Sequence, residues 1–316
     1  MALFPPFDDL PLRKDGPPGN AWGLFGDDDE CGMLNRITPE VVNAASKEIK
    51  DGVRIPTDLP IDFMSKPFFG RAPFQHTIKN KAPRSVNDDT LVFNTQISTQ
   101  WDGFRHFGYQ ESKKWFNNHT LDDILQTKVN GIHAWVEQGG IVGRGVLLDY
   151  AAWTEANNIA VNHFSPRSIS VAALQKIADT QGTELRKGDI LFVRTGWVRA
   201  FSNLSTEKAI ALADMTTPPA IGLESSRATA RWLWETGFAA VAGDQPSFEA
   251  WPCQNPEYML HEWLLAGWGM PIGEIFDLER LSEECRKRGR WSFFFSSMPL
   301  RVPGGVASPP NGVAIL

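Results

Sequence analysis

The chain has few cysteines and no long hydrophobic run. Its three cysteines, Cys31, Cys253 and Cys285, lie far apart, and no Cys-x-x-Cys pair occurs. The sequence therefore supports neither a disulfide framework nor a thiolate zinc site, and a reducing compartment fits. No apolar run approaches the roughly 20 residues that cross a membrane, and residues 1–23 contain prolines and acids where a signal peptide needs an apolar core. We expect a cytoplasmic protein with no membrane partner.

An excess of basic charge is also missing. The 31 Lys and Arg residues are outnumbered by 37 Asp and Glu, which gives a net charge of -6, and no basic run occurs. This balance argues against nucleic acid as a partner. With 316 residues, 42% of them hydrophobic, the chain is long enough for a sizeable core. We predict a single domain over residues 1–316, in which the Pro/Gly/Asp-rich residues 1–30 form an extended N-terminal arm.

Three common catalytic motifs are absent. Gly143-Arg144-Gly145 lacks the third glycine of a dinucleotide fingerprint, and it precedes a strand pattern instead of following one. His261-Glu262 begins like a zincin helix, but the second histidine is missing because position 265 is leucine. No G-x-S-x-G elbow occurs, which removes the ordinary serine-hydrolase interpretation.

Strand and helix patterns alternate along the chain. Thr38 followed by Pro39 is typical of a helix start, and Gly52 is a natural end for that helix. Further helical patterns lie at about 170–181, 223–236 and 259–267, and strand patterns at about 54–62, 90–101, 145–149, 189–195, 239–243 and 291–298. Residues 65–89 are rich in Pro, Lys and Arg and are predicted to be a long irregular loop, a candidate lid. The alternation predicts a layered α/β domain.

The segment 90–106 is the most informative part of the sequence. Its residues alternate so that Gln96, Ser98, Gln100 and Asp102 share one parity, and a strand would place them in one polar row. His106 follows four residues after Asp102. The row is either the wet face of an edge strand or the polar wall of a metal or acid/base site.

Two later residues extend the second interpretation. His261 opens a short amphipathic segment, and Glu274 follows it thirteen residues later. Each residue taken alone is more often structural than catalytic. Among the twelve tryptophans, Trp101, Trp115 and Trp197 suggest an aromatic or bulky substrate, although core packing explains each of them equally well.

These residues together resemble the cyclase superfamily of metal-dependent hydrolases, which includes bacterial kynurenine formamidases and isatin hydrolases. The hallmark of that superfamily, H-x-G-T-H-x-D-x-P-x-H, lies on residues 96–106 without a gap. Family-like stretches follow in order at 143–149, 188–197 and 243–247, and then at His261 and Glu274. The resemblance implies a layered β/β/α cyclase-like domain with a strongly curved mixed sheet, and a homo-oligomer, either a dimer or a tetramer.

The chain also departs from the hallmark. Gln96 and Gln100 replace its first two histidines, Ser98 its glycine and Phe104 its proline. An amide oxygen is a harder donor than an imidazole, so the change favours manganese over zinc, and two carboxylates balance one divalent ion better than a pair. We therefore expect one divalent metal ion, with the loss of the metal as an open alternative.

The resemblance implies a metal-dependent hydrolase that opens an amide, lactam or lactone bond of a small molecule. It assigns His106 as the general acid/base, and Asp102, His261, Glu274 and Gln100 as metal ligands. Gln96, Trp101 and Trp197 are expected to contact the substrate. Two alternatives stay open. The first is a lyase, isomerase or true cyclase acting on a natural-product intermediate, because amides orient a substrate better than they activate water. The second is a metal-free ligand-binding relative.

Overall fold

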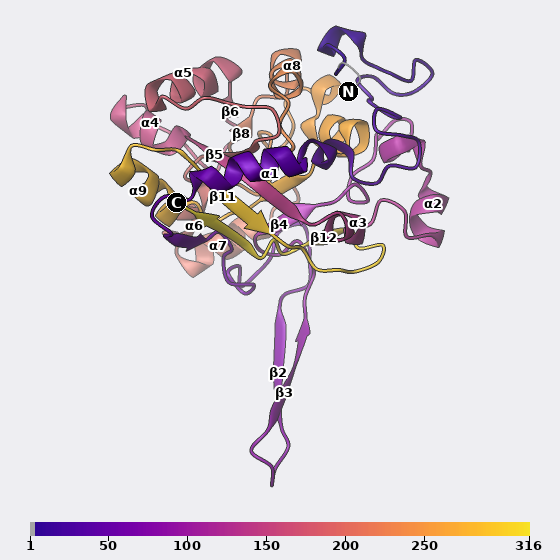
Figure 1. Ribbon diagram of the computed structural model, residues 1–316. Helices are drawn as coiled ribbons and strands as arrows, with labels where there is room; N and C mark the ends of the chain where they lie inside the picture. Colours follow the sequence, from indigo (N-terminus) through magenta and orange to yellow (C-terminus); the bar gives the residue numbers. More distant parts are fainter. Residues whose placement is uncertain (1–3) are drawn as a thin grey trace.

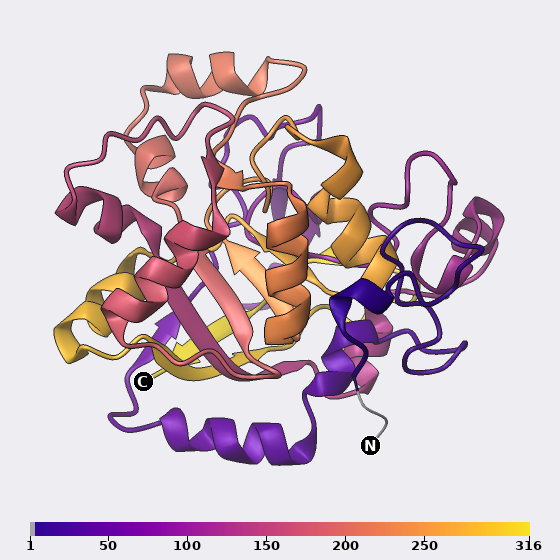
Figure 2. The ribbon, with the colours of Figure 1, turned by 90° about the horizontal axis from the view of Figure 1, so that it is seen from above.

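The computed structural model describes residues 4–316. Its central element is a nine-stranded mixed sheet (Figures 1 and 2). The sheet is strongly curled, and its strand order is β1-β13-β11-β5-β7-β9-β10-β4-β12. The strands are β1 (Arg54–Pro56), β4 (Gln100–Asp102), β5 (Ile141–Asp149), β7 (Ile190–Arg194), β9 (Ala240–Gly243), β10 (Ile272–Glu274), β11 (Ser292–Ser297), β12 (Ala307–Ser308) and β13 (Gly312–Ile315). The predicted fold class, a layered α/β domain with a curved mixed sheet, is confirmed.

The centre of the sheet is parallel and its edges are antiparallel. Strands β5, β7, β9 and β10 pair in parallel, whereas β4 pairs antiparallel with β10, and β11 antiparallel with β5. The parallel strands are apolar and buried along nearly their whole length, as expected for strands covered on both faces. This is why three of the predicted strands, those near 145–149, 189–195 and 239–243, are found close to their expected bounds. The predicted strand near 291–298 is also found, as β11, whose residues alternate between buried and half-buried.

Helices surround this sheet. They are α1 (Pro39–Ala45), α2 (Leu121–Gln126), α3 (His133–Glu137), α4 (Tyr150–Ala156), α5 (Val171–Gln181), α6 (Trp197–Ser202), α7 (Thr206–Ala213), α8 (Arg227–Thr236) and α9 (Glu279–Arg288). Helix α5 contacts β5, and α4 contacts β7. The α1 start is confirmed, since the Thr38 side chain accepts the backbone N–H of Val41. The predicted helix at 223–236 begins later, at Arg227, because Gly222–Leu223 forms strand β8 with β6 (Ser168–Ile169).

The prediction for residues 54–101 is largely wrong. The segment expected to be an irregular loop contains β2 (Gln75–Asn80), which pairs with β3 (Asn87–Val92) in a hairpin that projects from the body (Figure 1). All residues of both strands are exposed. The chain then runs irregularly through 93–99, and only Gln100–Asp102 joins the main sheet. At the other end, β1 stops at Pro56, since proline has no N–H for a ladder.

Residues 19–22, near the N-terminal end of the described chain, lie against the helix that follows His261. This helix, η6 (Glu262–Trp268), has π-type hydrogen bonds and ends at Gly269 in the left-handed region. The indole N–H of Trp22 donates to the Ala266 carbonyl over 2.7 Å, and that of Trp268 donates to the Gly19 carbonyl over 2.9 Å. Residues 19–22 and η6 thus each donate one indole hydrogen bond to a backbone carbonyl of the other.

Two further expectations concern the whole chain. Cys31, Cys253 and Cys285 form no disulfide in the described part of the chain. Across residues 4–316, none of the helices combines the length and the apolar character needed to span a membrane. The cytoplasmic location stays a prediction.

Candidate metal and catalytic site

The site is built where β4 and β10 lie side by side. Their antiparallel register places Gln100 opposite Glu274, so the two side chains share one face of the sheet. The Gln100 amide donates to Glu274 Oε2 over 2.9 Å. Asp102 lies two residues further along β4 and therefore faces the same side. All three side chains are buried.

Gln96 reaches the same point from the irregular segment before β4. Thr99 fixes this segment, because its hydroxyl donates to the Ile275 carbonyl over 2.6 Å and accepts the Leu59 N–H over 2.8 Å. The Gln96 amide nitrogen lies 2.7 Å from Asp102 Oδ1 and 3.2 Å from His106 Nδ1. Gln96, Gln100 and Asp102, which the alternation placed in one polar row, thus lie in contact, although the strand expected to align them begins only at Gln100.

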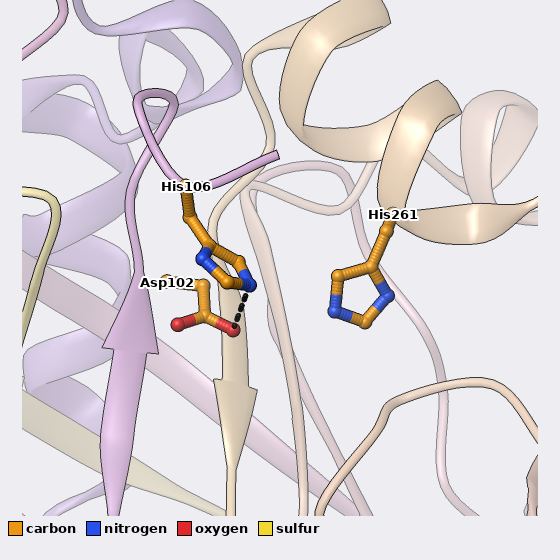
Figure 3. Close-up of side chains that lie close together, drawn as sticks. All are labelled: Asp102, His106 and His261. Carbon is orange, nitrogen blue, oxygen red and sulfur yellow. Dashed lines mark ion pairs between the residues drawn. The ribbon is translucent and has the colours of Figure 1, made fainter. Parts of the chain in front are cut away.

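Two histidines complete the cluster (Figure 3). His106 follows β4 after a turn, and its Nε2 lies 3.7 Å from Asp102 Oδ2. His261 immediately precedes η6, and its Nε2 lies 3.3 Å from Glu274 Oε1. One donor atom from each of Asp102, His106 and His261 lies within 4.8 Å of the other two. The structure thus brings together six residues singled out in the sequence: Gln96, Gln100, Asp102, His106, His261 and Glu274.

Glu249 is a member of the site that the sequence did not reveal. Its buried carboxylate accepts two bonds from His261, one from the backbone N–H over 3.1 Å and one from Nδ1 over 2.7 Å. A carboxylate behind a histidine is a common way to orient a metal-binding ring. The signal available in the sequence was weak: a lone acid between Phe248 and Ala250.

Burial and neighbouring charges set the protonation of these groups. Burial disfavours a charged His261 ring, but the carboxylates of Glu249 and Glu274 outweigh it and hold the pKa of His261 well above its usual value. Burial, reinforced by the Asp102 charge, raises the pKa of Glu274 to about 7. Burial lowers the pKa of His106, more than Asp102 raises it. His106 is therefore a neutral ring at neutral pH, with a lone pair to offer.

The donor set fits a divalent ion. Ligand atoms about 2.0–2.4 Å from one ion lie at most about 4.8 Å apart, which the Asp102, His106 and His261 atoms satisfy. Within the described residues, Asp102 Oδ2 and Gln100 Oε1 are buried and have no hydrogen-bond partner. Buried oxygens of this kind need a partner, and a cation would supply one. His106 is close enough to serve either as a ligand or as a proton acceptor.

A cavity of about 250 Å³ opens beside this cluster. It is lined by aromatic, polar and charged side chains: Phe69, Arg71, His106, Phe107, Pro246, Ser247, Trp251, His261 and Glu274. The predicted lid segment, 65–89, therefore does contribute to the cavity, through its first residues.

Neither of the two tryptophans expected to contact the substrate is among the described lining residues. Trp101 is fully buried on the other side of β4, where its indole N–H donates to Ser297 Oγ over 3.0 Å. Trp197 is also fully buried and stacks on Phe201, with ring centroids 4.8 Å apart. Trp251, which the sequence analysis did not single out, lines the cavity in their place.

Known proteins share this architecture. A crystal structure described as that of a novel cyclase superposes with a TM-score of 0.83 at 31% sequence identity, covering 94% of this chain and 99% of the other. Isatin hydrolase A from Labrenzia aggregata, bound to benzyl benzoate, gives a TM-score of 0.59 at 13% identity and covers 89% of this chain and 98% of its own. Isatin hydrolase A from Ralstonia solanacearum gives 0.57 at 16% identity, covering 88% of this chain and 97% of its own. At such identities these two hydrolases share the fold.

No curated protein matches the chain. The sequence model of the family described as "Putative cyclase" matches residues 40–250, about two thirds of the chain. Together with the 31% identical cyclase structure, this match settles the assignment. The chain belongs to the putative cyclase family.

Proposed function

We propose that this protein is a metal-dependent hydrolase that opens an amide, lactam or lactone bond of a small aromatic molecule. The observation that carries the proposal is the meeting of Asp102, His106, His261 and Glu274 beside a cavity with aromatic walls. The buried, unpartnered Asp102 Oδ2 supports a cation at this point. The fold shared with isatin hydrolases supports the class of substrate.

Asp102, His261 and Glu274 would hold the ion, and Gln100 would add its free amide oxygen. Two carboxylates, one imidazole and one amide oxygen form a harder donor set than the histidine-rich hallmark. We therefore favour a single manganese ion over zinc. A bound ion of this kind polarises a carbonyl and lowers the pKa of water.

His106 would move the proton. Its ring lines the cavity, 21% exposed, and is neutral at neutral pH, so a ring nitrogen can accept a proton from the attacking water. The same nitrogen then returns the proton to the leaving nitrogen or oxygen. Gln96 contacts both Asp102 and His106, and would hold the His106 ring toward the cavity.

A second candidate, a lyase, isomerase or cyclase, is favoured by the same Gln96 contact. An amide cannot accept a proton at neutral pH, so a glutamine in place of a histidine orients a neighbour without taking part in proton transfer. A lyase, isomerase or cyclase reaction does not need an activated water molecule.

The test combines metal analysis with a substrate panel. The purified protein is assayed for bound metal and then offered isatin, aromatic lactones and N-acyl anilines, with and without a chelator. We expect one equivalent of metal and ring opening or deacylation that stops on chelation and returns with Mn²⁺. A protein that binds no metal, or that turns over substrate without it, would refute the hydrolase proposal and favour the second candidate.

The expected homo-oligomer stays a prediction, which light scattering tests.

A further inference from the structure

Arg71 is the arginine among the residues that line the cavity. Its Nη1 donates to the backbone carbonyl of Gln96 over 2.6 Å, and its guanidinium lies 5.2 Å from the centroid of the Phe69 ring. No carboxylate of residues 4–316 forms an ion pair with it. One side of the guanidinium is thus fixed by the backbone, while the rest of its donors are uncommitted.

The carboxylate that lines the cavity, Glu274, feels the charge of Arg71, which lowers its pKa, but forms no ion pair with it. Glu274 is engaged by the Gln100 amide at 2.9 Å and by His261 Nε2 at 3.3 Å. It belongs to the candidate metal cluster, where a divalent ion would neutralise it further. Arg71 therefore presents a positive charge to the cavity without a direct carboxylate partner among residues 4–316.

Two neutral donors lie around the same cavity. Ser247 is 3% exposed and lines the cavity, and its hydroxyl has no hydrogen-bond partner among the described residues. The indole N–H of Trp251, another lining residue, is buried and likewise lacks a partner in the described part of the chain. Because buried donors are almost always paired, these two groups indicate a ligand that offers acceptors.

The remaining walls suit a flat apolar body. The rings of Phe69 and Trp251 lie 6.3 Å apart and nearly perpendicular, and Phe107 lies on the His261 side. Phe69 has a φ of 59°, a left-handed conformation that is costly for a bulky residue and that tends to persist at ligand sites. A cavity of about 150 Å³ accepts benzene, so about 250 Å³ accommodates one substituted or fused ring system.

We propose that Arg71 and Ser247 form an anion subsite, which selects aromatic substrates that carry a carboxylate. Arginine suits this role because its planar fork binds a carboxylate through two parallel hydrogen bonds. The inference rests on the proposed function: it names the substrate class of the same cavity, an aromatic amide, lactam or lactone with an acidic substituent.

The test compares benzoate with benzamide, which have the same ring and differ in charge. Binding of each to the metal-loaded protein is measured by calorimetry. We expect benzoate to bind roughly tenfold more tightly or better, the range of a charge-assisted hydrogen bond. Arg71→Gln should abolish this preference, and Ser247→Ala should reduce it. Arg84→Gln, at the exposed tip of the hairpin, is the matched control and should keep it.

Three results would overturn the proposal. The first is equal binding of benzoate and benzamide by the unmodified protein. The second is a benzoate preference that survives Arg71→Gln. The third is a preference that vanishes when the metal is chelated, because the carboxylate would then sit on the metal and not on Arg71. If Arg71→Gln does not fold, Arg71→Lys is used instead. Lysine keeps the positive charge but cannot form the two parallel hydrogen bonds of a guanidinium, so the variant should retain only part of the preference for benzoate.

The measurement is independent of turnover, so it separates this inference from the proposed function. A benzoate preference that depends on Arg71 would stand even if the protein hydrolysed nothing. Conversely, hydrolysis of neutral lactams by a protein without any preference for benzoate would leave the proposed function intact and refute the anion subsite.

Discussion

Replacing Glu249 by glutamine is the sharpest test of the metal cluster, because it changes one atom behind a ligand without touching the cavity. The two carboxylate oxygens accept the His261 backbone N–H over 3.1 Å and its Nδ1 over 2.7 Å. A carboxylate only accepts, so Nδ1 must carry a hydrogen, and Nε2 is left to face Glu274 and a metal.

Glutamine has a single acceptor oxygen, which creates two unfavourable outcomes. If that oxygen accepts the backbone N–H, the amide NH₂ faces Nδ1, and the His261 hydrogen must move to Nε2, where it blocks metal binding. If the oxygen instead accepts Nδ1–H, the NH₂ opposes the backbone N–H, and a buried donor is left unpaired at a cost of about 1–3 kcal/mol. We therefore expect Glu249→Gln to weaken metal binding by ~10–100-fold.

The assay is a competition titration of the metal between the protein and a fluorescent chelator, with a thermal melt to confirm folding. Glu262→Gln is the matched control: its side chain accepts the Gln110 N–H over 3.1 Å, which an amide oxygen can also do. A folded Glu249→Gln protein with unchanged metal affinity would show that Glu249 does not set the His261 tautomer, or that His261 is not a ligand.

The remaining predictions address the other members of the site. His106→Ala should lower turnover by ~10²–10⁴-fold while metal content stays constant, as measured by kinetics and elemental analysis; loss of the metal would make His106 a ligand instead of a base. Gln100→His should raise zinc affinity in the same competition titration, because imidazole replaces a free amide oxygen, and Gln96→His should raise it less. If neither variant changes the zinc affinity, the two glutamines are not metal ligands. Trp101→Ala should lower the free energy of unfolding by ~3–5 kcal/mol in a denaturant titration, because the side chain is fully buried, and it should not alter substrate selection; a stable protein with altered selectivity would contradict its place in the core.

The parts of the fold that followed from the sequence are those in which burial alone determines the residue types. Strands β5, β7 and β9 are apolar because both of their faces are covered, so their composition identifies them. All residues of β2 and β3 are exposed, so no buried apolar face marks these strands in the sequence, and only residues 90–92 of the hairpin fell within a predicted strand. Its existence depends on pairing between strands, which composition does not record.

The site shows the same division. Alternation along Gln100 and Asp102 predicted their common face, and the same alternation places Trp101 on the opposite one, so its expected role in substrate binding conflicted with the pattern itself. Glu249 could not be found in this way. The segment between Glu249 and His261 is irregular apart from the short turn at Pro256–Tyr258, so no helix or strand period relates the two positions.

The hydrogen bond from Arg71 to the Gln96 carbonyl has a consequence for how the chain can vary. Arg71 precedes β2 and Gln96 follows β3, so this bond ties together the two ends of the excursion that carries the hairpin. Beyond the tie, the β2–β3 hairpin projects away from the body (Figure 1). The excursion can therefore be lengthened, shortened or grafted with a foreign segment at its tip near Arg84, while the spacing that the cavity depends on is kept. The hairpin is thus attached to the body at Arg71 and Gln96, and both of these residues belong to the candidate active site.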